Sequence, residues 1–514
     1  MNRYRRREFL ANVGRGMLVA SLGPVLSGDL ELTSRAFAEE ESKPLTFGAL
    51  EPLASLMAET PIERLLPMLV DRLRSGIELR QLVSAAALAN ARAFGGQDYE
   101  GYHAFMALAP ALQMAAEMPE DRRALPVLKV LYRNTNHIRQ LGGRNHETLH
   151  RVEPAPLPKD ENPAEYLRAA MRKQDMEGAE RAFAELTRGP LDRAYDDLQY
   201  LVQDDVDVHR VVLAWRAWAL LDLTGKEHAH TLLRQSVRYC VANENRGRGN
   251  GASLRTLLPK LLDQYRLVER SLGERAADDA WVDRLARTIY ASTREQAAVA
   301  VAAALAEGFA PAVVGEAISL AANQLVLHDP GRTSSQASAG KPIGSIHGAS
   351  VGVHASDAAN AWRNIARVSN RRNTVAGLIV GAYHTAGQTS GLNPASYPLE
   401  EHRQKANEVK PEALLAELDA AVRAKDQFFA CALVDRMGTL DRPSRPVFDS
   451  LLGHAISEDG SLHAEKYYRT VTEEFATTRP AFRWRHLAAL ARVTASEHGF
   501  PAPGYAEACE LLKV

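Results

Sequence analysis

Apolar residues recur with the period of an α-helix along almost the whole chain from residue 48 onward. In residues 61–75 apolar side chains fall at i, i+3, i+4 and i+7, and Pro61 stands at the expected helix start. Alternating runs bounded by Asn-Gly or Asp-Gly, which mark β-hairpins, are essentially missing. The pattern therefore predicts an all-α fold of stacked antiparallel helical hairpins, either closed like an α/α-toroid or open like a solenoid.

Two stretches of the chain resemble each other in the order of their breaks. Residues 167–205 and 418–459 both run helix, Lys/Gln-Asp break, helix, Leu-Asp-Arg, helix and acidic end. Each is followed within a few residues by a histidine that opens another helix, His209 after the first and His463 after the second. The match predicts that the two stretches are equivalent structural units.

Two further stretches fit the same pattern more loosely. Residues 78–117 contain His103 at a helix start, and residues 293–368 contain His354 after a long Gly/Ser loop. A second histidine follows in or beside the next helix of every stretch: His137, His228 with His230, His384, and His486. Chance similarity among Ala- and Leu-rich helices is the competing explanation. The repeat predicts helical units at 39–160, 161–290, 291–410 (with the Gly/Ser-rich loop) and 411–514.

The first 38 residues have the order of an export signal. Arg6-Arg7 is followed by Phe9-Leu10, an apolar stretch at 17–22, and Ala36-Phe37-Ala38 as a cleavage site. This order resembles the twin-arginine (Tat) signal of bacteria, although Arg5 and Ala11 depart from its usual flanks. The alternative is a disordered basic tail. The resemblance implies a signal peptide over 1–38, the Tat translocase as partner during export, and a periplasmic protein that folds before it crosses the membrane.

Composition limits the classes of function. The 514 residues carry a formal net charge of -1, which argues against a protein that binds the nucleic-acid backbone. The three cysteines stand far apart and form no CxxC or CxxCH motif. No stretch after the signal is long and apolar enough to cross a bilayer, so we expect no integral membrane segment after processing.

The repeated first-turn histidines are the main candidates for chemistry. A helix start disfavours the imidazolium, so each ring would be neutral and able to act as a ligand or base. Converging imidazoles suit Fe, Zn or Cu, or an axial position of haem. We therefore expect a metal or haem at His103, His209, His228 and His354, with catalytic roles for His354 and His209. His463 fits less well, because Lys466 and Tyr467 on its face look exposed.

The same histidines could simply be buried packing residues that hydrogen-bond to nearby carbonyl groups. The acidic group at 204–207, just before His209, could orient an imidazole or only cap the next helix. The loop at 329–353 contains Arg332 and His347, which could bind a cofactor or an anionic substrate at the mouth of a pocket. It is not a phosphate-binding P-loop, because Ser335 and Pro342 replace the residues that such a loop requires.

Three short segments of the sequence resemble the questin oxidase-like proteins. They are His103 in YHAFMALAPAL, Asn134–His137 in LYRNTNHIRQLGG, and His354 in VHASDAANAW, within residues 78–400. The resemblance implies an oxygen-dependent enzyme that acts on aromatic, polyketide-type substrates. It favours an exported oxidoreductase with a His-lined pocket and a small organic substrate. The alternative is a helical-repeat scaffold of the periplasm without catalysis.

Replacing Arg6 and Arg7 by Lys tests the export prediction. Because the twin-arginine route requires the arginine pair, the precursor of the variant should stay in the cytoplasm and keep its signal. Cell fractionation and the size of the protein on a gel measure this outcome. Processing near Glu39 that is unchanged in the variant would contradict the prediction.

Overall fold

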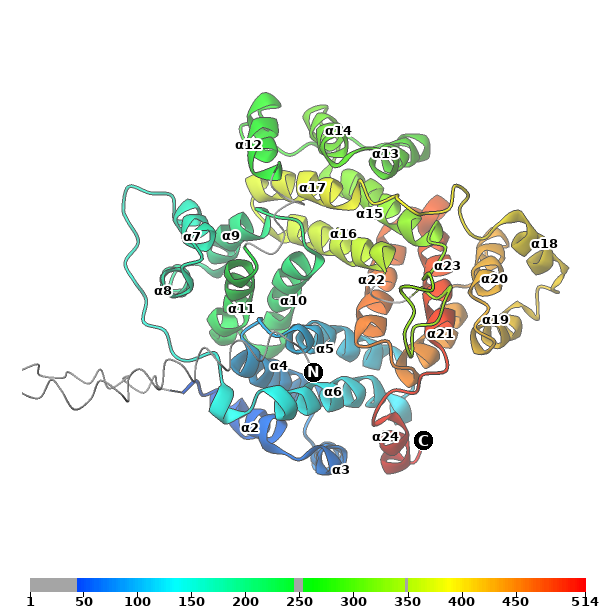
Figure 1. Cartoon of the computed structure of the whole chain (residues 1–514), viewed down its shortest axis with the longest axis horizontal. Helices are drawn as coiled ribbons and strands as arrows, with labels where there is room; N and C mark the ends of the chain where they lie inside the picture. The colour runs from blue at the N-terminus through cyan, green and yellow to red at the C-terminus, as the bar shows by residue number, and fades with distance from the viewer. Residues whose placement is uncertain (1–43, 245–252, 347–349) are drawn as a thin grey trace, which may run out of the picture. The chain divides into compact units, whose positions relative to one another are not determined.

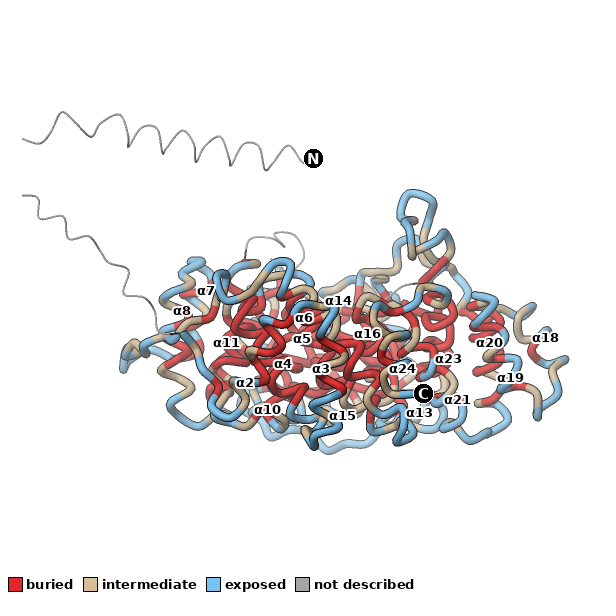
Figure 2. Tube along the Cα trace, turned by 90° about the horizontal axis from the view of Figure 1, so that it is seen from below, coloured by how far each residue is buried: buried red, intermediate tan, exposed pale blue. Residues whose placement is uncertain are grey.

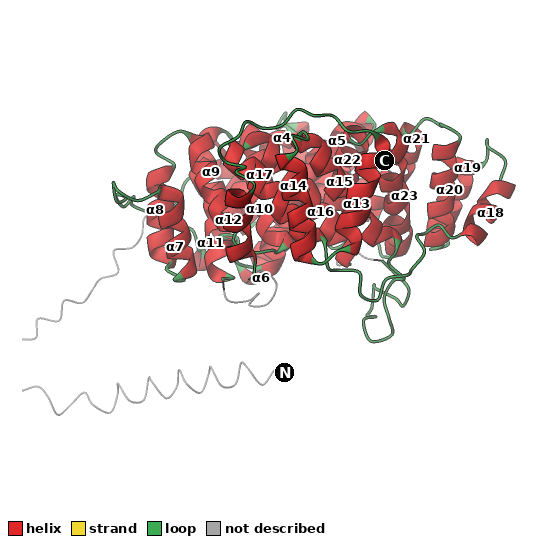
Figure 3. Cartoon of the chain, turned by 90° about the horizontal axis from the view of Figure 1, so that it is seen from above, coloured by secondary structure: helices red, strands yellow, loops and turns green. Residues whose placement is uncertain are grey.

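The chain is helical throughout the part that the computed structural model describes, residues 44–244, 253–346 and 350–514. Within these ranges there is no β-strand, and the only β-type pairings are isolated bridges. Helices therefore account for the fold, as Figure 3 shows, and the predicted all-α class is confirmed. The predicted signal peptide and His347 lie outside the described residues.

The helices are numbered in chain order in Figure 1. They are α2 (Glu51–Glu59), α3 (Ile62–Arg74), α4 (Leu79–Phe94), α5 (Tyr99–Glu117), α6 (Leu125–Leu141), α7 (Pro163–Arg172), α8 (Met176–Leu186), α9 (Leu191–Val202), α10 (Val208–Thr224), α11 (Ala229–Ala242), α12 (Leu254–Gln264), α13 (Asp279–Ala291), α14 (Arg294–Ala306), α15 (Pro311–Leu327), α16 (Val351–Val368), α17 (Arg371–Thr385), α18 (Glu400–Glu408), α19 (Leu414–Arg423), α20 (Gln427–Thr439), α21 (Arg445–Ser457), α22 (His463–Thr477), α23 (Pro480–Glu497) and α24 (Tyr505–Leu512). None of these helices is long and apolar enough to cross a membrane.

Four inner helices, α5, α10, α16 and α22, organise the unit formed by Pro44–Val514. They contact one another in turn: α5 with α10, α10 with α16, α16 with α22, and α22 with α5 (Figure 1). Each inner helix also packs against the helix before it and the helix after it, which gives four three-helix units, α4–α6, α9–α11, α15–α17 and α21–α23. Contacts between these units join the four predicted segments into one compact body.

The stretches at 167–205 and 418–459 have matching local structure. Two residues beyond the ends of α7 and α19 the backbone is left-handed, at Gln174 (φ 57°) and Lys425 (φ 61°). The next residue in each case is an aspartate, Asp175 or Asp426, whose carboxylate accepts a hydrogen bond from the first turn of the following helix. Helices α7–α9 then pack against α11, and α19–α21 pack against α23. The two stretches therefore occupy equivalent positions beside an inner helix pair.

The inner helices are buried on nearly all sides (Figure 2). A helix with neighbours all round has no solvent face, so its polar residues are buried together with its apolar ones. Lys466 and Arg216 are each only 3 % exposed, and Asp357 is 4 % exposed. The interior of the fold therefore contains charged groups, which must be stabilised locally.

The buried His486 of α23 gives a test of this packing through pH. Burial lowers its pKa to about 3, with further lowering by the charges of Arg363 and Arg485. Between pH 6.5 and about 3 the unfolded chain binds a proton that the folded chain does not, so stability falls as the pH falls, by about 1.4 kcal/mol per pH unit. Urea unfolding of His486→Gln, which does not titrate, should therefore show a shallower loss of unfolding free energy between pH 6 and pH 4.

The matched control is His146→Gln, because the His146 side chain is exposed. It should follow the wild-type pH dependence. A His486→Gln variant with the wild-type slope would show that this ring titrates normally in the folded protein.

Candidate functional site

Four histidines meet at the starts of the four inner helices. Neighbouring ring centroids lie 4.9 Å apart for His103–His209 and His103–His463, 5.5 Å for His209–His354, and 5.6 Å for His354–His463. Each ring comes from the first or second turn of its helix. We call this set the four-histidine cluster; it exists because the four helices begin at the same end of the inner group.

Hydrogen bonds fix which ring nitrogen carries the proton in three of the four histidines. The Nδ1 atoms of His103, His463 and His209 each face an oxygen that can only accept, so each Nδ1 is the donor in the neutral ring. The acceptors are the carbonyl oxygens of Tyr99 (2.7 Å) and Ser461 (3.1 Å) and the carboxylate of Asp207 (3.2 Å). In all three neutral rings the Nε2 atom is therefore left with a lone pair.

The Nε2 atoms lie where they have few other partners. Those of His103 and His209 are buried without a hydrogen-bond partner. Those of His354 and His463 are 3.5 Å apart, at the limit of a hydrogen bond. Nevertheless, no group of three or more His, Cys, Asp or Glu side chains in the described part of the chain is arranged to hold a metal ion.

Burial keeps two rings of the cluster, His103 and His354, neutral at physiological pH. It lowers the pKa of His103 far below the ordinary value, and the charges of Lys466 and His209 add to the effect. Burial also lowers the pKa of His354 to about 3, again helped by His209 and Lys466. Neutral imidazole is the form that accepts a hydrogen bond or coordinates a metal.

Asp207 holds one edge of the cluster in place. Burial alone would raise its pKa, but bonds and charge from His209, together with the bond from Tyr239, hold this pKa well below the usual range. Its carboxylate accepts from the backbone N–H of His209 (3.0 Å), from the ring of His209 and from the Tyr239 hydroxyl. Of the two roles considered for the acidic group before His209, Asp207 performs both: it caps α10 and orients the ring.

Two tyrosines form an aromatic rim beside the cluster. The Tyr99 ring lies 4.2 Å from His103 and is 51 % exposed, and the Tyr102 ring lies 4.9 Å from His103 and 5.1 Å from His209. The side chain of His209 is 16 % exposed. The cluster is therefore closest to solvent at this edge. Tyr99, Tyr102 and His103 stand at i, i+3 and i+4, a spacing that could have indicated a shared face in the sequence.

The four-histidine cluster differs from the predicted set of histidines at two positions. His463 belongs to the cluster, since Lys466 and Tyr467 on its helix are buried (3 % and 1 % exposed) and not exposed as expected. His228 does not belong: it follows the far end of α10, and its ring packs 5.9 Å from that of Phe47. An α-helix of 17 residues is about 25 Å long, so His228 cannot reach the ring of His209. The predicted metal and catalytic roles of His103, His209 and His354 remain predictions.

The loop before α16 lies on the same side as the cluster. Burial and the charge of Arg332 lower the pKa of Lys341, and the carboxylates of Glu497, of Glu100 in the first turn of α5 and of Asp459 just before α22 partly oppose this. The loop projects beyond the helix ends (Figure 3). It contacts α23, where the Ser496 hydroxyl accepts a hydrogen bond from the N–H of Ile346 at 3.2 Å. Arg332 lines a separate cleft of about 270 Å³ together with residues at the start of α16 and after α17.

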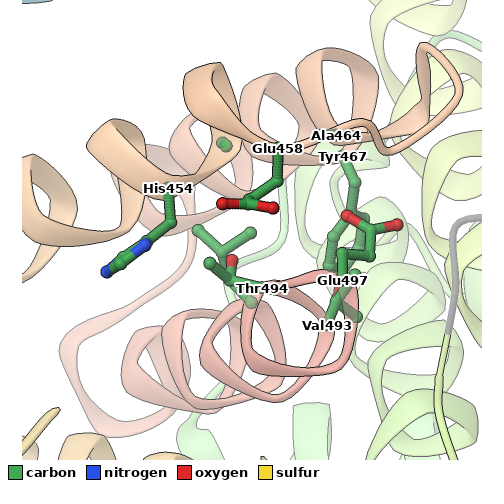
Figure 4. A pocket seen from close by; sticks show the side chains of 9 residues that line it. His454, Glu458, Ala464, Tyr467, Val493, Thr494 and Glu497 are labelled. Atoms are coloured by element: carbon green, nitrogen blue, oxygen red, sulfur yellow. The ribbon is translucent and has the colours of Figure 1, made fainter. Parts of the chain in front are cut away.

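A second small cavity lies between α21, α22 and α23 (Figure 4). It measures about 10 Å³, which is room for one water molecule. Glu458 on its wall accepts hydrogen bonds from the N–H groups of Gly499 and Phe500. This cavity is too small for an organic substrate, and the candidate chemistry stays with the cluster.

Comparison with known proteins gives no further guide to this site. No protein-family model, curated protein or solved structure matches the chain. The resemblance to questin oxidase-like proteins therefore rests only on the short segments around His103, Asn134–His137 and His354.

Replacing Asp207 by Ala should lower the free energy of unfolding by about 1–3 kcal/mol. The change removes a helix cap and leaves the buried Tyr239 hydroxyl without its acceptor. Asp207→Asn keeps a capping oxygen and should lose less. Urea unfolding measures the stability, and ¹⁵N chemical shifts of the His209 ring report the loss of the fixed tautomer.

Asp175→Ala is the control for the cap alone, since the Asp175 carboxylate caps the exposed start of α8. If Asp207→Ala and Asp175→Ala lose the same stability, the bonds to the His209 ring and to Tyr239 contribute nothing.

Proposed function

We propose that the chain is an exported, metal-dependent oxidoreductase whose transition-metal ion binds to the four-histidine cluster. The observation that carries this proposal is the fixed tautomer of His103, His209 and His463. In each ring an oxygen acceptor holds Nδ1–H, so the lone pair of the neutral ring is on Nε2. Metal-binding histidines in proteins typically donate their other N–H to a carbonyl or a carboxylate in this way.

The spacing of the rings also supports a single ion. Imidazole nitrogen binds first-row metals at about 2.0–2.1 Å, so two ligand nitrogens on a tetrahedral ion are about 3.4 Å apart and their ring centroids about 5 Å apart. The Nε2 atoms of His354 and His463 are 3.5 Å apart, and the ring centroids lie at 4.9–5.6 Å. Rings this close leave no room between them for a haem macrocycle.

The choice of ligands favours a redox metal. Four imidazoles would saturate tetrahedral zinc, whereas copper and iron accept further ligands and keep a position for substrate or oxygen. The bound ion would supply electron transfer or activation of oxygen, and the four rings would hold it without neutralising its charge.

The aromatic rim supports a small, planar organic substrate. Tyr99 is 51 % exposed and its ring lies 4.2 Å from that of His103, so an aromatic ring can stack on it beside the cluster. An aromatic substrate agrees with what the questin oxidase-like resemblance implies.

The competing function is that of a helical-repeat scaffold in which the histidines only pack. One observation favours it: the described residues include no group of three donors set around a point where an ion would bind. In that case the Nε2 atoms would accept hydrogen bonds from water, and the cluster would be a polar joint between the four units.

Metal analysis tests the proposal directly. Protein purified from its native host should contain about one copper or iron ion per chain, and Co²⁺ added to the metal-free protein should give an absorption spectrum typical of nitrogen ligands. His103→Gln and His463→Gln should each weaken Co²⁺ binding by about 100-fold or more, because each removes a ligand.

His228→Gln serves as the matched control, since this residue lies at the far end of α10, and it should bind Co²⁺ like the wild type. A protein that binds no ion, or binds one equally well without His103 and His463, would leave the scaffold as the better description.

A further inference from the structure

Two buried cations below the four-histidine cluster have no hydrogen-bond or ion-pair partner among the residues that the structure describes. Lys466 of α22 and Arg216 of α10 are each 3 % exposed. Neither forms a hydrogen bond or an ion pair with any residue in the described ranges, and the Nε atom of Arg216 is fully buried. A buried charge without a bonded partner is strongly unfavourable, so this arrangement requires an explanation.

Both side chains extend toward the cluster. Lys466 is one turn beyond His463, and Arg216 is two turns beyond His209, about 10 Å along the helix. Long side chains on a helix point back toward its N-terminus, which is the direction of the histidines here. Burial lowers the pKa of His103 and of His354, and the positive charge of Lys466 lowers both further.

The nearby carboxylates do not neutralise both cations. Glu473 is already bonded to Arg469 at 2.7 Å and to Asn364 at 3.0 Å. Asp357, one turn beyond His354, accepts a hydrogen bond from Thr470 at 2.7 Å. Glu465 also acts on Lys466 but is paired with Lys129 at 2.7 Å, and Glu100, which acts on Lys466 too, is exposed. Among the described residues, Asp357 is therefore the one buried carboxylate near Lys466 and Arg216 that is not bonded to another cation, and the two cations exceed it by one positive charge.

We infer that the interior below the cluster binds a small anion, a carboxylate or an inorganic oxyanion, between Lys466 and Arg216. Its negative charge would balance the excess positive charge and its oxygens would accept the unused N–H groups. The inference deepens the proposed function by assigning an acidic group to the substrate or co-ligand of the same site. It does not require the metal, because the two cations are part of the chain itself.

The ammonium of Lys466 and the guanidinium of Arg216 would bind the anion in different ways. The planar guanidinium suits two oxygens of one carboxylate or oxyanion, whereas the ammonium acts as a point charge. An aromatic acid would place its ring toward the Tyr99 rim and its carboxylate toward the two cations.

Isothermal titration calorimetry with acetate and with inorganic phosphate, in chloride-free buffer at pH 7, tests the inference on both metal-free and metal-loaded protein. We expect one anion per chain in both forms. Lys466→Met should weaken binding about 10-fold or more, and Lys466→Arg should restore most of it. Asp357→Asn removes the competing negative charge and should tighten anion binding about 3-fold or more, which a merely destabilised protein would not do.

Lys341→Met is the matched control, because Lys341 lies on the loop on the same side as the cluster but outside the inner helices; it should bind anions like the wild type. Absence of anion binding in both forms overturns the inference. Binding that needs the metal and ignores Lys466→Met also overturns it, since the anion would then sit on the ion, and the proposed function would stand. Anion binding to a protein that takes up no metal would support the inference and count against the proposed function.

Discussion

The convergence of four helix starts on one point is the constraint on which this architecture depends. Each start carries about half a positive charge from the helix dipole, so four of them together repel cations and favour neutral or negative groups. Carboxylate or hydroxyl caps occupy three of the starts, Asp98 on α5, Asp207 on α10 and Ser350 on α16. The four histidines lie in the first or second turns of these helices. The same dipole field makes the region attractive to anions.

The convergence also encloses the inner helices. On an enclosed helix a polar residue no longer indicates the side that faces solvent. On a surface helix, charged residues mark the solvent face, and sequence reasoning relies on that rule. On α22 the rule fails, because neighbours cover every side and Lys466 is buried with the apolar residues. The cost of burying such charges is met by pairing where the chain supplies a partner, as for Lys129 with Glu465 at 2.7 Å.

The sequence predicted the helices, the repeat and most of the cluster, because those depend on local pattern. A helical period, an aspartate after a break and a histidine in the first turn are all readable within about 40 residues of chain. His463 was set aside because burial depends on which helices surround α22, and that is a property of the whole fold. His228 was included because the repeat places a second histidine in or beside the next helix of each stretch, although α10 separates it from His209 by its full length. The orientation of the rings by Tyr99, Asp207 and Ser461 needed coordinates.

The contact between α5 and α22 joins distant parts of the chain. The Tyr468 hydroxyl donates to Glu117 at 2.8 Å across 351 residues of sequence. Contacts between such distant segments generally form late in folding, after the local hairpins exist. His463 can therefore reach His103 only when synthesis is nearly complete and the last three-helix unit has docked. A complete cluster reports that the whole chain has folded, so any ligand that needs all four rings would bind only finished molecules and would stabilise them against reopening.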